Sequence, residues 1–121
     1  MKYFINHTNH PSNRWSAEQI AAAKIFGEIF DLQFPAVNPR ASTAEVRLLV
    51  ADNLQKILEL KPAAVLCQGE FNYTFEMTAR LKNLGVKVLA ATTERVSVEE
   101  IQPDGSTRQT STFRFVRFRE Y

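Results

Sequence analysis

The sequence predicts an α/β protein with a Rossmann-like three-layer domain, in which a four-stranded parallel sheet carries helices on both faces and a C-terminal β-hairpin. Two observations predict this fold. Short apolar stretches alternate with stretches of helical hydrophobic spacing as far as residue 91, and an Asp-Gly turn then separates two final strand-like segments. The length of 121 residues suits one domain, residues 1–121, and is too short for two separate cores.

The N-terminal part predicts two strands with a helix between them. Residues 2–6 form a short buried strand, and residues 28–32 form the second strand. A polar loop over residues 7–15 leads into the helix, which starts at Ala17 after a Ser-x-x-Gln capping box and stops at Gly27.

The middle of the chain predicts a longer helix and the central strand. Ser42 and Glu45 form a second capping box, and the helix that follows ends just before Pro62. Residues 63–67 are apolar throughout, which is typical of a parallel strand buried on both faces. Residues 68–71 form the turn out of this strand.

The C-terminal part predicts a third helix that ends at Gly85 and a fourth strand over residues 86–91. Residues 92–95 form a polar loop, and residues 96–101 and 107–121 pair as a hairpin. Right-handed crossovers favour the order 2-1-3-4 for the parallel strands. This order reverses direction between strands one and three, and ligands bind at such a crevice. The loops after strands one, three and four meet there.

Composition narrows the class of protein. Hydrophobic residues make up 45% and charged residues 23% of the chain, as in ordinary globular proteins. No stretch is long and apolar enough for a membrane span, and the N-terminus turns polar too early for a signal peptide, so we expect a cytoplasmic protein without a membrane partner. The single cysteine, Cys67, lies in an apolar run and is interpreted as a buried core thiol.

Charge gives weaker information. The net charge is +2, and from Gly105 onward four arginines stand against Glu120. A basic tail of this size suits a compact anionic ligand or a dimer contact, whereas duplex nucleic acid needs a broader basic face. Neither a Walker motif nor a G-x-G-x-x-G motif occurs, which removes most support for an ATPase or a dinucleotide-dependent dehydrogenase.

The candidate site residues lie in the three loops, and each also has a purely structural interpretation. The turn at Gln68, Gly69, Glu70 and Phe71 either leads into a helix or presents the helix N-terminus to a phosphate. The histidines of the first loop are either solvated or able to transfer a proton near neutral pH. They are three residues apart, but no third metal ligand is visible nearby, so no metal and no cofactor are expected.

Further candidates lie beside these turns. Trp15 either packs on the first helix or stacks on a base. Arg95 either binds phosphate or pairs with Glu94 or Glu99. The aromatic-basic segment over residues 113–121 is interpreted as a strand packed on the core or on a second subunit, in preference to an RNA-binding strand.

Several motifs resemble a group of small CRISPR-associated accessory proteins of type III systems, which have a stand-alone CARF-like domain of the Rossmann type. The resemblance covers nearly the whole chain. It rests on Asn-His-Pro-Ser at residues 9–12 with Trp15, on Gln-Gly-Glu-Phe at residues 68–71, on Thr-Thr-Glu-Arg at residues 92–95 and on the C-terminal Arg-Phe-Arg-Glu-Tyr. The segment between the His and the first helix is longer than in those relatives.

The resemblance implies a homodimer that binds cyclic oligoadenylate, a second messenger, across its two-fold axis. Several such proteins are metal-independent ring nucleases that linearise cyclic tetra-adenylate. In this chain the resemblance implies proton transfer or charge stabilisation by His10 and Arg95, and orientation of the ribose 2′-OH by Glu70. Residues that would contact phosphate, ribose or adenine are Asn9, Ser12, Trp15, Gln68, Gly69, Phe71, Thr92 and Thr93.

Two other functions stay open at this point. The chain could bind the messenger without cleaving the ring, since the same loops would serve both purposes. It could instead be a regulatory partner that docks another protein through its Phe/Arg tail, and substitutions at Phe115 and Arg117 would then remove function while substitutions at Gln68 or Arg95 would not.

Overall fold

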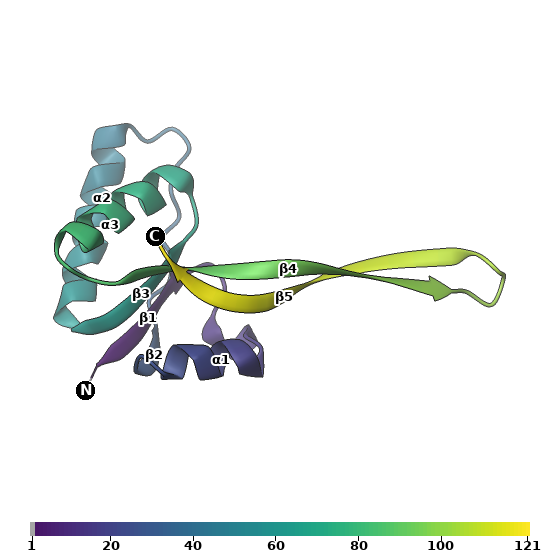
Figure 1. Cartoon of the computed structure of the whole chain (residues 1–121). Coiled ribbons are helices and arrows are strands. Elements are labelled where there is room, and N and C mark those ends of the chain that lie inside the picture. Colours follow the sequence, from purple (N-terminus) through teal and green to yellow (C-terminus); the bar gives the residue numbers. More distant parts are fainter. Residues whose placement is uncertain (1) are drawn as a thin grey trace.

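The computed structural model describes residues 2–121, which build three layers around one five-stranded sheet (Figure 1). The elements in chain order are β1 (Tyr3–Thr8), η1 (Ser12–Arg14), α1 (Ala17–Lys24), β2 (Glu28–Asp31), α2 (Thr43–Glu59), β3 (Pro62–Gln68), α3 (Phe71–Asn83), β4 (Val88–Ile101) and β5 (Thr107–Glu120). The sheet order is β2-β1-β3-β4-β5. The first four strands are parallel in the predicted order, and β5 joins β4 antiparallel at the edge.

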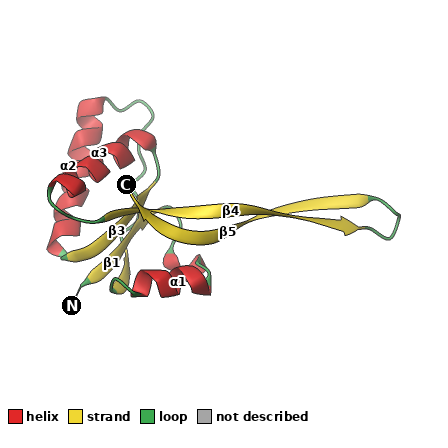
Figure 2. Cartoon of the chain, viewed as in Figure 1, coloured by secondary structure: helices red, strands yellow, loops and turns green. Residues whose placement is uncertain are grey.

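The central strands β1 and β3 are covered on both faces, which explains their continuous apolar sequences. Alternate side chains point to opposite sides, so Phe4 and Leu66 pack with α1, whereas Ile5 and Val65 pack with α2 and α3. Figure 2 shows α1 on one face of the sheet and the other two helices on the opposite face. The prediction of helices on both faces is therefore confirmed.

The helix boundaries follow the capping residues. Ser16 Oγ accepts a hydrogen bond from the backbone N–H of Gln19, and the Ser42–Glu45 capping box at α2 is complete in both directions. After α3 the chain turns at Gly85, whose φ of 78° lies in the left-handed region that glycine adopts without strain. The predicted helix starts at Ala17 and after Ser42 are thus confirmed.

The largest difference from the prediction concerns β4. Residues 92–95 were expected to be a loop between a core strand and a separate hairpin, but they lie in the middle of one continuous strand. Every residue from Leu89 to Ile101 has a partner on β5, and the side chains of Glu94 and Arg114 form an ion pair across the two strands. Beyond Thr92, β4 and β5 form a two-stranded hairpin, which we call the ribbon. Polar residues are tolerated in this part of β4 because the ribbon is open to water on both faces.

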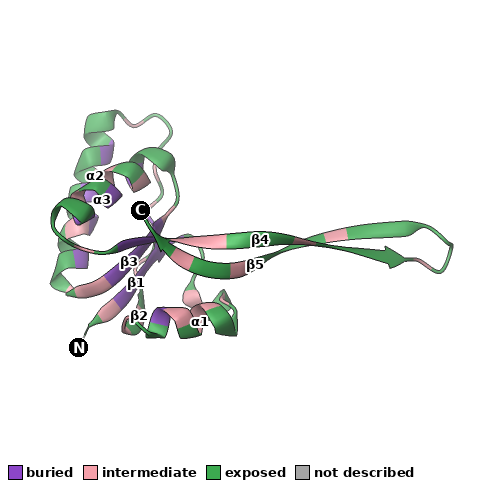
Figure 3. Ribbon diagram, in the orientation of Figure 1, coloured by how far each residue is buried: buried purple, intermediate pink, exposed green. Residues whose placement is uncertain are grey.

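A register shift marks the place where the ribbon leaves the three-layer part of the molecule, which we call the body. Thr92 pairs with Arg117 and Thr93 with Phe115, so Val116 is an extra residue on β5. The Thr92 hydroxyl lies at this irregularity, where it accepts from the Arg117 N–H and donates to the Arg117 carbonyl. Beyond this point the ribbon projects from the body with both faces exposed (Figure 3).

Two smaller predictions also need correction. His7, which was expected to begin the polar loop, belongs to β1 and is fully buried, and Phe71, which was expected in a turn, is the first residue of α3. Among the described residues, none of the helices has both the length and the apolar character required to cross a bilayer.

Candidate functional site

The loop after β1 is held by a network of polar side chains that runs from the buried Asn6 to the exposed Asp31. Asn6 Nδ2 donates to the carboxylate of Asp31 at 2.8 Å and to the carbonyl of His10 at 2.9 Å. The Ser12 hydroxyl also donates to Asp31, at 2.8 Å. The carboxylate at the end of β2 therefore ties the beginning of η1 to the end of β1.

The backbone of His10 is the centre of this network. Its carbonyl oxygen also accepts from Trp15 Nε1 at 3.1 Å and from the Thr8 hydroxyl at 3.2 Å. The Trp15 ring meets the ring of Phe4 in β1 edge-on at 6.2 Å, so it packs against the sheet. The His10 residue is exposed although its backbone is fixed, an arrangement that can present an imidazole to a ligand in a defined position.

The side chain of Gln68 extends the sheet beyond the end of β3. Its amide oxygen accepts from the N–H of Ala91 at 3.0 Å, and its amide nitrogen donates to the Ala91 carbonyl at 3.3 Å. Both groups thus act like the backbone of a strand residue. Gln68 is held in place by β4 and forms part of the wall of a pocket.

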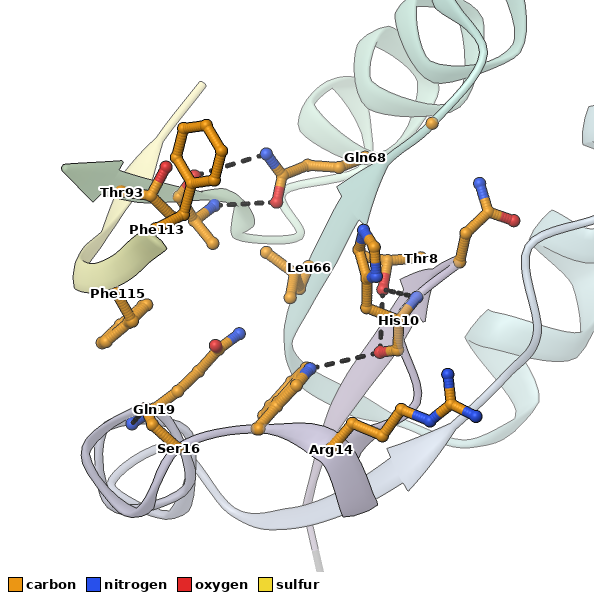
Figure 4. A pocket seen from close by; sticks show the side chains of 14 residues that line it. Thr8, His10, Arg14, Ser16, Gln19, Leu66, Gln68, Thr93, Phe113 and Phe115 are labelled. Carbon is orange, nitrogen blue, oxygen red and sulfur yellow. Dashed lines mark hydrogen bonds between the residues drawn. The ribbon is translucent and has the colours of Figure 1, made fainter. Parts of the chain in front are cut away.

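This pocket, which we call the strand-edge pocket, lies where β1 and β3 end and the ribbon begins, and its volume is about 690 Å³. Figure 4 shows Phe113 and Phe115 of the ribbon on one side, and His10 and Arg14 of the loop after β1 on the other. The fourteen residues that line it are Thr8, Asn9, His10, Arg14, Trp15, Ser16, Gln19, Leu66, Gln68, Gly69, Ala91, Thr93, Phe113 and Phe115.

The chemistry of this lining suits an anion that carries aromatic groups. Arg14 supplies a permanent positive charge and His10 a titratable ring, and none of the fourteen lining residues is acidic. Trp15, Phe113 and Phe115 supply flat apolar surfaces on which bases can stack. Amides and hydroxyls make up most of the remaining polar lining, and groups of these kinds can form hydrogen bonds with ribose or with base edges.

The structure brings six of the predicted site residues to this pocket and leaves five outside it. Those in the lining are Asn9, His10, Trp15, Gln68, Gly69 and Thr93. Those outside it are Ser12, Glu70, Phe71, Thr92 and Arg95.

The residues outside the lining have defined contacts of their own. Glu70 is the N-cap of α3, and its carboxylate accepts from the N–H of Tyr73 at 2.8 Å. Arg95 donates to the hydroxyl of Ser111 at 3.1 Å across the ribbon, and not to the acidic residues considered for it from the sequence. Phe71 is 90% exposed and lines a separate groove along α3.

Gly69 has a packing role that the sequence did not indicate. Its φ is not in the left-handed region, and a Cβ atom built on it would overlap the ring of Phe34. That ring is 4% exposed and packs edge-on against Tyr73 at 4.7 Å. The glycine is therefore required by a close contact beneath the pocket.

His7 and His10, close in sequence, have different environments. The His7 ring is fully buried, with Nδ1 2.8 Å from the Leu32 carbonyl and Nε2 2.6 Å from the Tyr73 hydroxyl. A carbonyl oxygen only accepts, so Nδ1 carries the hydrogen and Nε2 accepts from Tyr73. Burial lowers the pKa of His7, against the opposing effect of the Leu32 hydrogen bond. His7 is a neutral core residue.

The described side chains offer neither an activated thiol nor a cluster of three potential metal ligands. Burial raises the pKa of the Cys67 thiol to about 12, which is unsuited to a nucleophile and agrees with a core thiol. Within residues 2–121, no three His, Cys, Asp or Glu side chains gather in a way that could hold a metal ion.

Eight lining residues were not among the predicted site residues: Thr8, Arg14, Ser16, Gln19, Leu66, Ala91, Phe113 and Phe115. Four of them, Arg14, Gln19, Phe113 and Phe115, add charged, amide or aromatic groups to the lining. Arg14 and Gln19 lie close in sequence to Trp15, which was a predicted site residue. This proximity was the signal that could have identified them. Phe113 and Phe115 alternate along β5 and share one face of the ribbon, a signal that becomes useful only once that face is known to border the pocket.

Comparison with known proteins gives one match. No curated protein and no solved structure matches the chain. The family model that matches covers residues 2–119. Because this is nearly the whole chain, including every residue of the strand-edge pocket, the protein belongs to the Uncharacterized protein MJ1673 family.

Proposed function

We propose that this chain binds cyclic oligoadenylate, most readily cyclic tetra-adenylate, in the strand-edge pocket, and linearises it to end type III CRISPR signalling in the cytoplasm. The motif resemblance and the interpretation of the body as a doubly wound Rossmann-like domain support this proposal. The observation that carries it is the pocket lining, which combines Arg14 and His10 with three aromatic rings and lacks any acidic residue among its fourteen members. Cationic groups attract the phosphates of such a ring, and its adenines can stack on aromatic rings.

The proposed reaction is an internal transfer at one phosphodiester. The ribose 2′-oxygen forms a bond to the adjacent phosphorus as its proton leaves, and the bond from phosphorus to the 5′-oxygen breaks as that oxygen gains a proton. The products are a 2′,3′-cyclic phosphate and a 5′-hydroxyl, so neither water nor a metal enters the balance. Catalysis then depends on in-line placement and on stabilising the negative charge.

The geometry refines the residue roles within this proposal. His10 is the candidate for proton transfer, and Arg14 is the candidate for phosphate charge, since both line the pocket. Glu70 is assigned to capping α3, because its carboxylate already accepts from a backbone N–H. Arg95 pairs with Phe113 on the ribbon but does not itself line the pocket, so it would contact a part of the ring that extends beyond the pocket.

The size of the ligand favours two copies. A pocket of about 690 Å³ is of the size that holds a drug-sized molecule, and a ring of four nucleotides is larger. Two pockets related by a two-fold axis would match the symmetry of cyclic tetra-adenylate, each holding half of the ring. The homodimer is part of the proposal for this reason.

The test is to incubate the purified chain with labelled cyclic tetra-adenylate in EDTA, and to separate products and bound complexes. We expect linear products over many turnovers, at least tenfold less cleavage by His10→Ala with binding retained, and weaker binding by Arg14→Ala. Arg40→Ala, in the exposed loop before α2 and outside the pocket lining, is the matched control and should behave as the parent. Neither binding nor cleavage, with any ring size, would refute the proposal.

A second function, binding without cleavage, is favoured by one observation. Glu70 caps α3 and does not line the pocket. Among the lining residues, His10 is therefore the only His, Asp or Glu. An enzyme that needs both a base and an acid would have to use this one ring twice, or obtain the second group from another copy. Tight binding of an intact ring in the same assay would identify a messenger sponge or sensor.

A further inference from the structure

The ribbon beyond the body is the most unusual part of the molecule. We call residues 96–112 the arm, which comprises the outer parts of β4 and β5 and their connecting turn. Cross-strand pairs run from Val96 with Thr112 to Ile101 with Thr107. Figure 1 shows the arm extending away from all three helices, and only three of its residues are even half-buried.

The arm has a defined turn and is regular in structure. At its tip the N–H of Gln102 donates to the Ser106 carbonyl at 2.7 Å, and Gly105 adopts a φ of 87°. The Asp104 carboxylate accepts from the N–H and hydroxyl of Ser106. A two-stranded ribbon standing alone in water is at best marginally stable. The arm buries few side chains, so a second surface that covers it would stabilise it.

The apolar side chains of the arm show where that surface would lie. Ile101 is 84% exposed and Val98 is 49% exposed, and they point to opposite faces. Such side chains on a long free edge favour association with another chain.

The distribution of charge favours a second copy of the chain as the partner. The arm carries Glu99, Glu100 and Asp104 against Arg108, and the rest of the chain carries 14 Lys/Arg against 10 Asp/Glu. The arm is therefore acidic, and the rest of the same molecule is basic. An acidic ribbon disfavours nucleic acid as the partner and complements the body of a second copy.

The body offers an apolar groove of suitable character. This α3 groove, of about 900 Å³, is lined along one helix face by Phe71, Phe75 and Ala79, and at its end by Tyr121. Phe71 and Phe75 are 90% and 68% exposed, and the Thr78 hydroxyl in its wall is buried without a hydrogen-bond partner among the described residues. The chain's own arm points away from α3, so it cannot fill this groove (Figure 1).

We propose that two copies of this chain assemble by docking each arm into the α3 groove of the other. The exposed side chain of Ile101 packs against Phe71 and Phe75 in the groove. The acidic arm lies against the basic body of the other copy. The contact defines how the homodimer of the proposed function is built, but it depends on the second copy and not on the nucleotide.

Light scattering after size exclusion, over a range of protein concentrations, tests the assembly. We expect a dimer for the parent and at least tenfold weaker association for both Ile101→Glu and Phe75→Glu. Leu48→Glu is the matched control, because Leu48 is 70% exposed on α2 outside the groove, and it should dimerise as the parent does. Circular dichroism melting confirms that each variant is folded.

A photo-crosslinking residue placed at position 101 tests the docking site. In a mixture of isotope-labelled and unlabelled chains, we expect crosslinks from this position to peptides of α3 in the other chain. A parent that is monomeric at all concentrations, a dimer that Ile101→Glu leaves intact, or crosslinks confined to other surfaces would each overturn the proposal. So would a gel shift showing RNA bound by the arm. A dimer that neither binds nor cleaves cyclic tetra-adenylate would remove the proposed function and leave this inference standing.

Discussion

His7 and His10 show how burial separates two residues of the same type. His7 ends up inside the body because β1 continues to Thr8, which places its ring on the α2 and α3 side of the sheet beside Tyr73. His10 stands two residues after that strand, where the chain has reached the surface. The first ring fixes structure, and the second is available to a ligand.

The neutral state of His7 predicts how stability depends on pH. Burial lowers the pKa of His7 in the folded chain from its ordinary value of 6.5, so the unfolded chain binds the proton more readily. Stability is therefore fully present above about pH 6.5 and declines as the pH falls toward the native pKa, by up to about 1.4 kcal/mol per pH unit. Urea unfolding between pH 7.5 and about 5.5 measures this decline.

A matched variant assigns the decline to the correct histidine. His10→Gln should retain it, because the buried ring is unchanged. Titration of the His7 ring by NMR gives a direct second measurement. If His7 titrated in the folded protein at the value of a free histidine, the prediction would be wrong.

Gly69→Ala tests the contact beneath the pocket. The added methyl would overlap the ring of Phe34, which is confined by Tyr73 and His7, so we expect a loss of about 1–3 kcal/mol in the free energy of unfolding. The cost should shrink in a Phe34→Leu background, where the ring is gone. Equal costs in the two backgrounds would show that the Phe34 contact is not the reason for the glycine.

At the scale of elements, the cap of α3 offers a test that separates structure from catalysis. Glu70→Ala removes the acceptor for the Tyr73 N–H and should lower the free energy of unfolding by about 1 kcal/mol, whereas Glu70→Gln keeps an oxygen there and should cost less. Thermal unfolding measures both. If the parent cleaves the ring, we expect the Glu70→Gln variant to cleave it as well. Loss of cleavage in this variant, with its stability retained, would show that Glu70 takes part in catalysis.

The elements that sequence reasoning recovered are those with one dominant physical signal. β3 was recognised because it is covered on both faces, which demands apolar residues throughout, and α2 because its capping box and buried face agree. β4 was divided wrongly because only its first residues are in the core. From Thr93 to Ile101 the pairing with β5 determines the strand, and the sequence of β4 alone does not reveal that partner.

The candidate site was predicted to a similar extent. The sequence located the loops after β1 and β3 because polar residues following buried strands gather at one sheet edge, and Asn9, His10 and Gln68 do line the pocket. The sequence could not show that the Glu70 carboxylate caps α3 by accepting a hydrogen bond from its backbone. Nor could it show that β5 folds back to place Phe113 at the pocket, because such a contact depends on strand register.

At the scale of the whole molecule, one strand serves two purposes. The first residues of β4 complete the parallel sheet beside β3, and its remainder leaves the body as half of the ribbon. The strand-edge pocket lies at this transition, with Thr93, Phe113 and Phe115 in its wall. Docking of the arm on a second copy would therefore alter the position of the pocket wall, because β4 and β5 form both.

Hydrogen exchange of the backbone gives the last prediction. In a dilute monomer, we expect amides of the arm to exchange far faster than those of β1 and β3, because the arm has paired backbone but almost no buried side chains. At protein concentrations where the chain assembles, the arm amides should become protected, while the same amides in Ile101→Glu stay fast. Exchange in the arm that is slow at every concentration would mean that the ribbon is stable by itself. The argument that a second surface stabilises it would then fail.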